Sequence, residues 1–501
     1  MARGTDLLPL DTTGLGWTVA VIFAPLAGAL LGFLAPRRSV AVGLAAATAT
    51  AISAVGLAHA VLTQGPLRLT VGGWGAPLGI DLYADGLSAT LLLMTALVAL
   101  AVSAHAPAYF GDKPRQSARF WPLWLFLWTA LNALFLAADL FNLYVTLELL
   151  GLAAVALTAL GGNGDALTGA MRYLLVSLLG SLAYLLGVAL LYHAYGSLDL
   201  AVLSALVADS PATRAALGAM IAGLLLKTAL FPFHFWLPGA HASAPAPVSA
   251  LLSALVVKAS FYLLLRLWLG LFGGFGAPLA ELLGALGAAA VLWGSVQALR
   301  QPRLKLLIAY STVAQLGYLF LAFPLAAVGG AAVWGGALYL VLAHALAKAA
   351  MFLTAGSLLR FGHHDRIADL DRAVYRLPLT VTAFALAGVS IMGLPPSGGF
   401  VGKWLLLEAA FHQGRWDLAL VMLLGGALAA AYVFKVVGFA FTPAYAGHRA
   451  GSVPAAMEWS ALLLAVGAIL LGFAGPLVWP LLEVGAPFAA PPAPATWQVR
   501  P

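Results

Sequence analysis

The sequence predicts an all-α, polytopic membrane protein with about fourteen transmembrane helices. It is 62% hydrophobic and only 9% charged, and apolar stretches long enough to cross a membrane recur along almost all of it. Soluble domains contain roughly a quarter charged residues, whereas about 20 consecutive apolar residues suffice for a helix to span a bilayer. A core this apolar therefore needs lipid as its solvent.

Apolar runs between polar segments give the order of the helices. The polar N-terminus, MARGTDLLPLDTTG, lacks the basic start, short apolar core and cleavage site of a signal peptide, so we expect the first helix to remain. No soluble domain interrupts the helices, and the longest polar stretch covers residues 360–376. The helices are expected to begin near Gly16, Ser39, Ala84, Arg119, Asp139, Leu167, Arg214, Val248, Gly276, Lys305, Ala327, Pro378, Trp416 and Trp459.

Basic residues are unevenly distributed between the predicted loops. If the N-terminus lies outside, the inside loops hold fourteen of them and the outside segments five. Because Lys and Arg concentrate in cytoplasmic loops, this bias predicts an even number of spans with both termini outside a bacterial or archaeal inner membrane. The inside set is Arg37, Arg38, Lys113, Arg115, Arg119, Arg172, Arg300, Arg303, Lys305, Arg360, Arg366, Arg372, Arg376 and Arg449, and the outside set is Arg3, Arg68, Arg214, Arg415 and Arg500.

The seventh and twelfth predicted helices are broken by proline and glycine. One break is LKTALFPFHFWLPGAHASAPAP, with two prolines soon after Lys227, and the other is MGLPPSGGFVGKW, with two prolines just before Lys403. Proline opens the helical hydrogen-bond ladder. Lipid cannot satisfy the freed groups, so each break must face protein or water. Two such helices in corresponding places indicate an inverted-repeat transporter.

The chain is therefore expected to divide into four parts. Residues 1–118 hold helices one to three, and residues 119–272 form a first five-helix repeat of helices four to eight. Residues 273–441 form a second, inverted repeat of helices nine to thirteen, and residues 442–501 hold the last helix and a tail.

The chain contains no cysteine, which excludes iron–sulfur clusters, thiol catalysis and disulfides from it. It also contains no phosphate-cradling glycine loop and no dinucleotide fingerprint. We expect no cofactor and no metal on this chain, and we expect any redox energy to come from a partner.

Several ionisable residues fall within the predicted apolar helices. A charge at the centre of a bilayer costs about 2.5 to 3.5 kcal/mol on insertion scales, and such residues by default mark ion pathways. Each therefore needs a partner or water. The six basic residues of this kind are Lys227, Lys258, Arg266, Lys348, Lys403 and Lys435.

Glu148 and Lys227 are predicted to form a pair at the start of a proton path. Burial favours the neutral amine of a lysine, whereas a neighbouring carboxylate favours the charged form. A pair that opens and closes would therefore switch Lys227 between holding and releasing a proton. The alternative is a static ion pair that holds helices together.

Lys258 has no carboxylate near it in the sequence, and we interpret it as the central relay. His344 and Lys348 lie four residues apart, hence on one helix face. Histidine titrates near neutral pH, which suits a relay. Arg266 is expected to be structural or to snorkel from its helix end.

Lys403 follows the second break and is predicted to be the last relay group before the outside. His234 and His241 flank the first break and either line a water path or bond freed carbonyls. Lys435 is expected to snorkel and Glu408 to be interfacial. Acidic groups at helix starts favour the helix dipole, which accounts for Asp81, Asp85 and Asp139.

These residues carry a specific resemblance. From about Gly72 to Phe441 the chain resembles the antiporter-type subunits of respiratory complex I, membrane-bound hydrogenases and Mrp-type cation/proton antiporters. The motifs are GGWGAPLGIDLYADGLSA, DLFNLYVTLE, LLKTALFPFHFWLPGAHASAPAPVSALLSALVVK, RLKLLIAYSTVAQLGY, HALAKAAMF and GLPPSGGFVGK. One departure is Leu306, where many relatives have a basic residue.

The resemblance implies a fourteen-helix inverted repeat with a polar axis at the membrane midplane. It assigns proton-relay roles by position, without a cofactor and in a complex with other membrane subunits. The residues concerned are Glu148, Lys227, Lys258, His344, Lys348 and Lys403.

Three kinds of assembly fit this resemblance. We favour a Mrp-type antiporter whose D-like subunit exchanges protons for sodium or another cation. The second is a proton pump driven by quinone or hydrogenase chemistry, in a complex classed as an NADH–quinone oxidoreductase. The third is a membrane subunit that energises uptake of inorganic carbon. A structural scaffold is the remaining interpretation, and the buried ionisable groups argue against it.

Overall fold

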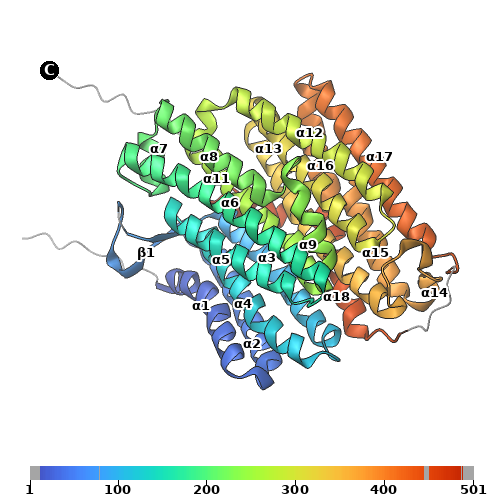
Figure 1. Cartoon of the computed structure of the whole chain (residues 1–501). Coiled ribbons are helices and arrows are strands. Elements are labelled where there is room, and N and C mark those ends of the chain that lie inside the picture. Colours follow the sequence, from blue (N-terminus) through green and yellow to red (C-terminus); the bar gives the residue numbers. More distant parts are fainter. Residues whose placement is uncertain (1–11, 78, 445–450, 487, 489–501) are drawn as a thin grey trace, which may run out of the picture.

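A computed structural model of the chain describes residues 12–77, 79–444, 451–486 and 488. Helices form nearly all of the described chain and pack side by side in one bundle (Figure 1). The long helices are α1 (Thr12–Leu34), α2 (Ser39–Gln64), α3 (Gly86–Tyr109), α4 (Pro114–Leu136), α5 (Leu140–Ala159), α6 (Gly164–Tyr195), α8 (Pro211–Thr228), α11 (Val257–Leu267), α12 (Ala277–Arg300), α13 (Leu304–Gly362), α15 (Pro378–Met392), α16 (Gly398–His412), α17 (Trp416–Phe439) and α18 (Ala455–Leu470). The short ones are α7 (Leu200–Leu206), α9 (Leu237–Ser243), α10 (Ala246–Leu251), α14 (Ala373–Arg376) and α19 (Gly475–Leu482).

Twelve helical segments of the described chain are long and apolar enough to cross a membrane. Two shorter apolar helices, Leu304–Phe320 and Pro378–Met392, lie where the sequence predicts the tenth and twelfth spans. Helix α13 contains two helices that meet at Gly330, whose φ of 50° lies in the left-handed region that favours glycine. The polytopic all-α architecture is confirmed, and the number fourteen stays a prediction.

The chain departs from a purely helical fold at one hairpin. Strands β1 (Leu67–Thr70) and β2 (Asp81–Ala84) pair antiparallel, with Leu67 opposite Ala84 and Thr70 opposite Asp81. Figure 1 shows β1 at the edge of the bundle, and it packs against α1. We call this end of the bundle the hairpin face. Asp81 therefore lies in a strand, and its predicted place at a helix start is wrong.

Side-chain caps and prolines fix where several helices begin. Asp85 accepts a hydrogen bond from the backbone N–H of Ser88, and Asp139 accepts one from that of Asn142. Each side chain satisfies a donor that the first turn of a helix leaves free. Both positions agree with the predicted role of these carboxylates at helix starts. Pro114, Pro211 and Pro378 each occupy a first helical position, where their fixed φ suits the helix.

Small residues let the helices approach closely. A side chain at Gly180 would meet the backbone oxygen of Gly223, and one at Gly287 would meet that of Gly317. In membranes, close packing of helix backbones replaces much of the hydrophobic drive that holds soluble cores together. These contacts bring α6 against α8 and α12 against α13.

Both predicted interruptions are present in the fold. Helix α8 ends at Thr228, and the chain resumes as a short 3-10 turn before α9. Helix α15 ends at Met392, and α16 begins at Gly398. The fold has a further irregularity that the sequence did not predict. The segment that carries Lys258 contains a π-helical turn at Leu252–Val256. Such turns recur at functional sites, since they leave backbone carbonyls outside the regular ladder.

Candidate proton-transfer site

The first charged pair lies between α5, α6 and α8. The Lys227 ammonium is 3.6 Å from a carboxylate oxygen of Glu148, and it donates a hydrogen bond of 3.0 Å to the Ser177 hydroxyl. The Ser181 hydroxyl donates to the same carboxylate. The lysine side chain is 6% exposed and the glutamate 18%, so the pair sits at an edge of the bundle rather than at its centre.

Glycines make room for this pair. A side chain on Gly151 would lie 3.6 Å from the Lys227 nitrogen and 2.6 Å from the Ser177 oxygen. One on Gly180 would lie 3.0 Å from the lysine stem. The amine therefore reaches α5 and α6 because the facing positions carry no side chain.

The first interruption leads from Lys227 toward Lys258. Ala229 adopts a left-handed φ of 57° at the end of α8, and the Trp236 indole donates to the Leu226 carbonyl, which also accepts the Ala229 backbone N–H. The Thr228 hydroxyl donates to Ser260 on α11 at 2.9 Å. Hydroxyl groups both donate and accept, so this contact is chemically suited to a proton path between the two helices.

Lys258 is fully buried, and its ammonium donates to the Ser253 carbonyl in the π-helical turn. Within the described residues no carboxylate forms an ion pair with it. The Ser253 hydroxyl contacts Thr312 of α13 at 2.8 Å. A lysine met only by carbonyls and hydroxyls is less firmly held in its charged form than one met by a carboxylate.

His344 and Lys348 lie one turn apart in the second part of α13, and both are buried. The Lys348 ammonium donates to the Ile308 carbonyl at 3.2 Å and to the Ser311 hydroxyl. The His344 ring lies within electrostatic reach of Lys258, Lys348 and Lys403. The histidine therefore stands among the three lysines and is not an isolated core residue.

Lys403 closes the set at the second interruption. Its ammonium donates to the Ile391 carbonyl at 2.7 Å and lies 4.2 Å from the centre of the Tyr318 ring. The end of α15 is the negative end of that helix dipole, which favours a cation there. Gly393 has a φ of 84°, and a side chain on it would lie 2.6 Å from the lysine stem.

The two histidines near the first interruption differ from each other. His241 is fully buried, with its ring 5.9 Å from that of Phe352, and it lies within electrostatic reach of Lys258. His234 is half-buried and stacks on Phe231 at 5.5 Å. Neither lines the cavities of about 470 and 390 Å³ that open at the two ends of the bundle, and their role along a water path stays a prediction.

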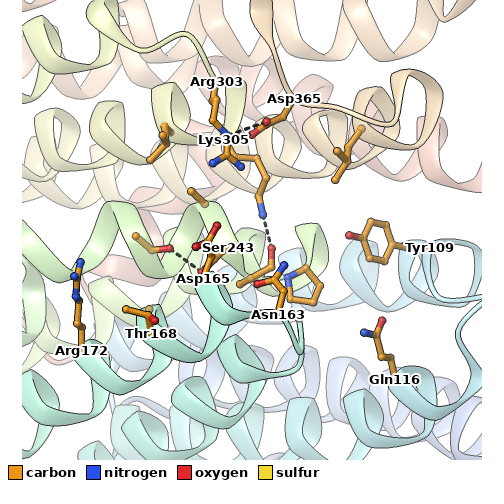
Figure 2. Close-up of a pocket in the computed structure, with 18 of the residues that line it drawn as sticks. Tyr109, Gln116, Asn163, Asp165, Thr168, Arg172, Ser243, Arg303, Lys305 and Asp365 are labelled. Atoms are coloured by element: carbon orange, nitrogen blue, oxygen red, sulfur yellow. Dashed lines mark hydrogen bonds and ion pairs between the residues drawn. The ribbon is translucent and has the colours of Figure 1, made fainter. Parts of the chain in front are cut away.

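A cavity of about 470 Å³ opens at the end of the bundle opposite the hairpin face, between α6, α9 and α13 (Figure 2). Figure 2 shows Lys305 extending into it from the first turn of α13 to donate to a carbonyl, which belongs to Ala244. Lys305 is only 4% exposed. The helix start predicted near Lys305 is confirmed, since α13 begins at Leu304. The residue was also counted among those of the inside loops, but it lies in the first turn of the helix and is buried against the end of α9.

Two further basic residues have partners that sequence reasoning did not find. Arg266 does not snorkel, because it forms a bidentate ion pair with Asp85 at 2.5 and 2.6 Å. Lys435 donates to the carbonyls of Leu299 and Gln301 at the end of α12, where it acts as a helix cap. The Asp85–Arg266 pair joins residues 181 positions apart, and no local pattern announces it.

The fold and the buried row of ionisable groups define the class of the protein as an antiporter-like polytopic membrane subunit. The family described as NADH:quinone oxidoreductase/Mrp antiporter, TM, matches residues 137–429, and the chain belongs to this family. The matched range contains all six predicted relay residues.

Two relatives and one solved structure place it further. The chain is 36% identical to NADH-quinone oxidoreductase subunit N of Desulforudis audaxviator, over 94% of this chain and 99% of that one. It is 32% identical to the D subunit of the Na(+)/H(+) antiporter of Bacillus subtilis, over 78% and 80%. It resembles a chain of the Mrp complex from Dietzia sp. DQ12-45-1b with a TM-score of 0.84 and 25% identity, over 94% and 96%.

Proposed function

We propose that the chain conducts protons along a row of buried side chains, as one subunit of a multisubunit antiporter-type complex. Protons enter near Glu148 and Lys227, pass Lys258, then His344 and Lys348, and leave at Lys403. The observation that carries the proposal is that Lys258, Lys348 and Lys403 are buried and held by carbonyls or hydroxyls, with no carboxylate within ion-pair distance among the described residues. Each amine can therefore exist with or without its extra proton.

The charges in the row act on one another. Lys258 interacts electrostatically with Lys348, and Lys348 does so with Lys403. Like charges in a poorly screened interior repel, so a proton arriving on one lysine favours release from the next. This coupling moves a charge along the row without any group travelling far.

The assembly we favour is a Mrp-type cation/proton antiporter in which neighbouring subunits couple the proton flux to sodium. Two observations support this assembly: the fold shared with a chain of the Mrp complex, and the 32% sequence identity to the D subunit of a Na(+)/H(+) antiporter. A second candidate is a proton-pumping subunit of a complex I-like NADH–quinone oxidoreductase. The full-length match to a subunit N supports that candidate.

Co-purification from native membranes distinguishes the two assemblies. An antiporter complex should yield only membrane subunits, and its proton flux should follow an imposed sodium gradient. A redox complex should yield cofactor-bearing partners, and its flux should require an electron donor. Flux that ignores sodium and needs a donor would overturn the antiporter assignment.

The organisation of the chain is part of the proposal. We take residues 119–272 and 273–441 as two inverted repeats, flanked by 1–118 and 442–501, since each repeat contains one interrupted helix. We also place both termini outside, on the side of the hairpin face. Lys113, Arg172 and Arg303 line the cavity at the opposite end, and they support this orientation because Lys and Arg concentrate in cytoplasmic loops. Of the residues counted for this bias, Arg3, Arg449 and Arg500 lie outside the described part of the chain.

The entry pair has a direct test. We expect Lys227→Ala to abolish proton transport by the assembled complex, because alanine carries no proton. Lys435→Ala is the matched control, since it removes another lysine of an apolar helix that lies outside the row. The measurement is proton flux in vesicles that contain equal amounts of each complex. Near-normal flux in the Lys227 variant would remove the proposed entry.

A further inference from the structure

Two cavities lie at opposite ends of the segment that carries Lys258. The segment runs over Ala246–Phe272, and Pro245, just before it, lines the larger cavity. A second cavity of about 390 Å³ lies at the hairpin face, and Leu269 lines it. Lys258 stands between the two, about 12 Å along the helix from Arg266 at 1.5 Å per residue.

One face of α11 leads from Lys258 to the second cavity. Lys258, Tyr262 and Arg266 are spaced four residues apart, which places them one above another on the helix. Tyr262 and Arg266 both line the cavity. A proton that left Lys258 toward the hairpin face would therefore have to pass these two side chains.

Hydrogen bonds hold both of these side chains in place. The Arg266 guanidinium donates to both carboxylate oxygens of Asp85, to the Ser88 hydroxyl at 3.0 Å and to the Tyr262 hydroxyl at 3.0 Å. The Tyr262 hydroxyl in turn donates to the Phe135 carbonyl at 2.8 Å. Helices α3, α4 and α11 are thus tied together at one point, close to the hairpin.

None of these groups is suited to carry a proton. A guanidinium stays protonated in proteins and offers no acceptor. Burial alone would raise the pKa of the Asp85 carboxyl, yet Arg266 and Ser88 hold it below its usual range. The carboxylate therefore stays ionised and paired, and the Tyr262 hydroxyl is already engaged on both sides.

The opposite end of the segment is built differently. Lys305, at the larger cavity, donates to one backbone carbonyl and has no carboxylate within ion-pair distance among the described residues. An ammonium has three donors and can release a proton, which a guanidinium cannot. The two ends of the segment therefore differ: a cation that stays protonated, Arg266, lies at the hairpin face, and a titratable one, Lys305, lies at the larger cavity.

We propose that Arg266, held by Asp85 and Tyr262, is a fixed barrier that isolates Lys258 from the cavity at the hairpin face. Lys258 then exchanges protons only with the rest of the row and with the opposite side. The barrier prevents protons from flowing passively through the first repeat, from one side of the membrane to the other, down the proton gradient. This inference rests on the proposed function, because it takes Lys258 as a proton carrier.

The test is passive proton leak through the purified complex in liposomes, driven by a potassium diffusion potential and read with an internal pH dye. The first variant combines Arg266→Ala with Asp85→Asn, so that no unpaired charge stays buried. The second combines Arg266→Gln with Asp85→Asn, which keeps the volume and serves if the first does not assemble. We expect leak to rise about tenfold, the change that a barrier lower by ~1.4 kcal/mol gives.

Adding Lys258→Met to either variant should return the leak to the wild-type level, because the leak runs through that lysine. A purely structural ion pair would not produce this dependence. Arg68→Ala is the matched control, since Arg68 lines the same cavity and pairs with Asp81 and Asp199 but does not lie on α11. We expect it to stay tight.

Two results would overturn the barrier. One is a proton leak no higher than that of the wild type in both Arg266/Asp85 double variants. The other is a raised proton leak that persists after Lys258→Met is added. Neither result touches the proposed function, which fails separately if Lys258→Met alone leaves driven transport intact.

Discussion

At the scale of single residues, the environment of each carboxylate decides its role. Asp85 meets a guanidinium and stays ionised, whereas Asp139 lies beside Asp199 in a backbone bridge and close to Asp81. The three aspartates 81, 139 and 199 are all buried, and only Arg68 pairs with two of them within ion-pair distance in the described chain. Burial first, and then the neighbouring carboxylates, raise the pKa of Asp139.

This environment predicts how stability depends on pH. Because the folded-state pKa of Asp139 is raised, the folded protein binds the proton more tightly than the unfolded chain does. The stabilisation is present below the ordinary pKa of an aspartate, near 3.9, and is lost as pH rises through the raised value. We therefore expect Asp139→Asn to melt a few degrees above the wild type at pH 8, with a smaller difference at pH 5.

Thermal unfolding of the purified complex at pH 8 and pH 5 measures the difference in melting temperature between the Asp139→Asn variant and the wild type. Asparagine keeps an oxygen that can accept the cap bond from Asn142, so the substitution isolates the charge. A difference that grows toward pH 5, or a lower melting temperature at pH 8, would contradict the account.

Residue types alone revealed the buried lysines, because a charge inside an apolar helix is visible in any sequence. Their neighbours were not visible. Ser177 and Ser181 are ordinary residues of an apolar helix until the fold places them beside Lys227 and Glu148. The burial of Lys305 was missed for a similar reason, since it depends on where the end of α9 lies.

At the scale of helices and strands, contact surfaces depend on single small residues. A side chain at Gly43 in α2 would lie 2.0 Å from the ring of Trp121 in α4. The indole ring is rigid, so the clash can be relieved only if the backbones of α2 and α4 move apart. Overpacking of this kind costs about 1 to 3 kcal/mol.

We therefore expect Gly43→Ala to lower the melting temperature of the complex by several degrees without changing proton flux per assembled molecule. Gly218→Ala in α8 is the control, because within the described part of the chain no atom outside its own helix lies within 4 Å of the added carbon. That substitution should be neutral or slightly stabilising, since alanine is favoured over glycine in helices by about 1 kcal/mol. Fluorescence-monitored unfolding compares the two. Equal melting temperatures would contradict the close packing of α2 on α4.

The sequence predicted both helix interruptions, because proline and glycine are strong local signals. It did not predict the π-helical turn at Leu252–Val256, which has no residue that marks it. The β-hairpin was missed as well. Its strands are four residues each, and the glycines and the single proline between them are equally typical of an irregular loop.

At the scale of the whole molecule, composition was the most reliable guide. Long apolar runs with few charges predict a bundle of membrane helices, and twelve helical segments of the described chain are long and apolar enough to cross a membrane. Long-range pairing was beyond reach, as the ion pair between Asp85 and Arg266 illustrates. Such contacts follow from how helices pack, and packing has no local signature in a single sequence.

The central claim is that the buried ionisable groups form one connected path, and the middle of that path is its most vulnerable point. Lys258 has no carboxylate partner among the described residues and links the two halves of the row. The decisive measurement is driven proton flux in vesicles containing the complete complex with Lys258→Met, which keeps most of the side-chain volume and removes the proton. The account predicts that flux falls to the background of empty vesicles while every subunit remains assembled. Flux close to that of the wild type would show that protons cross without this lysine, and the connected path would be wrong.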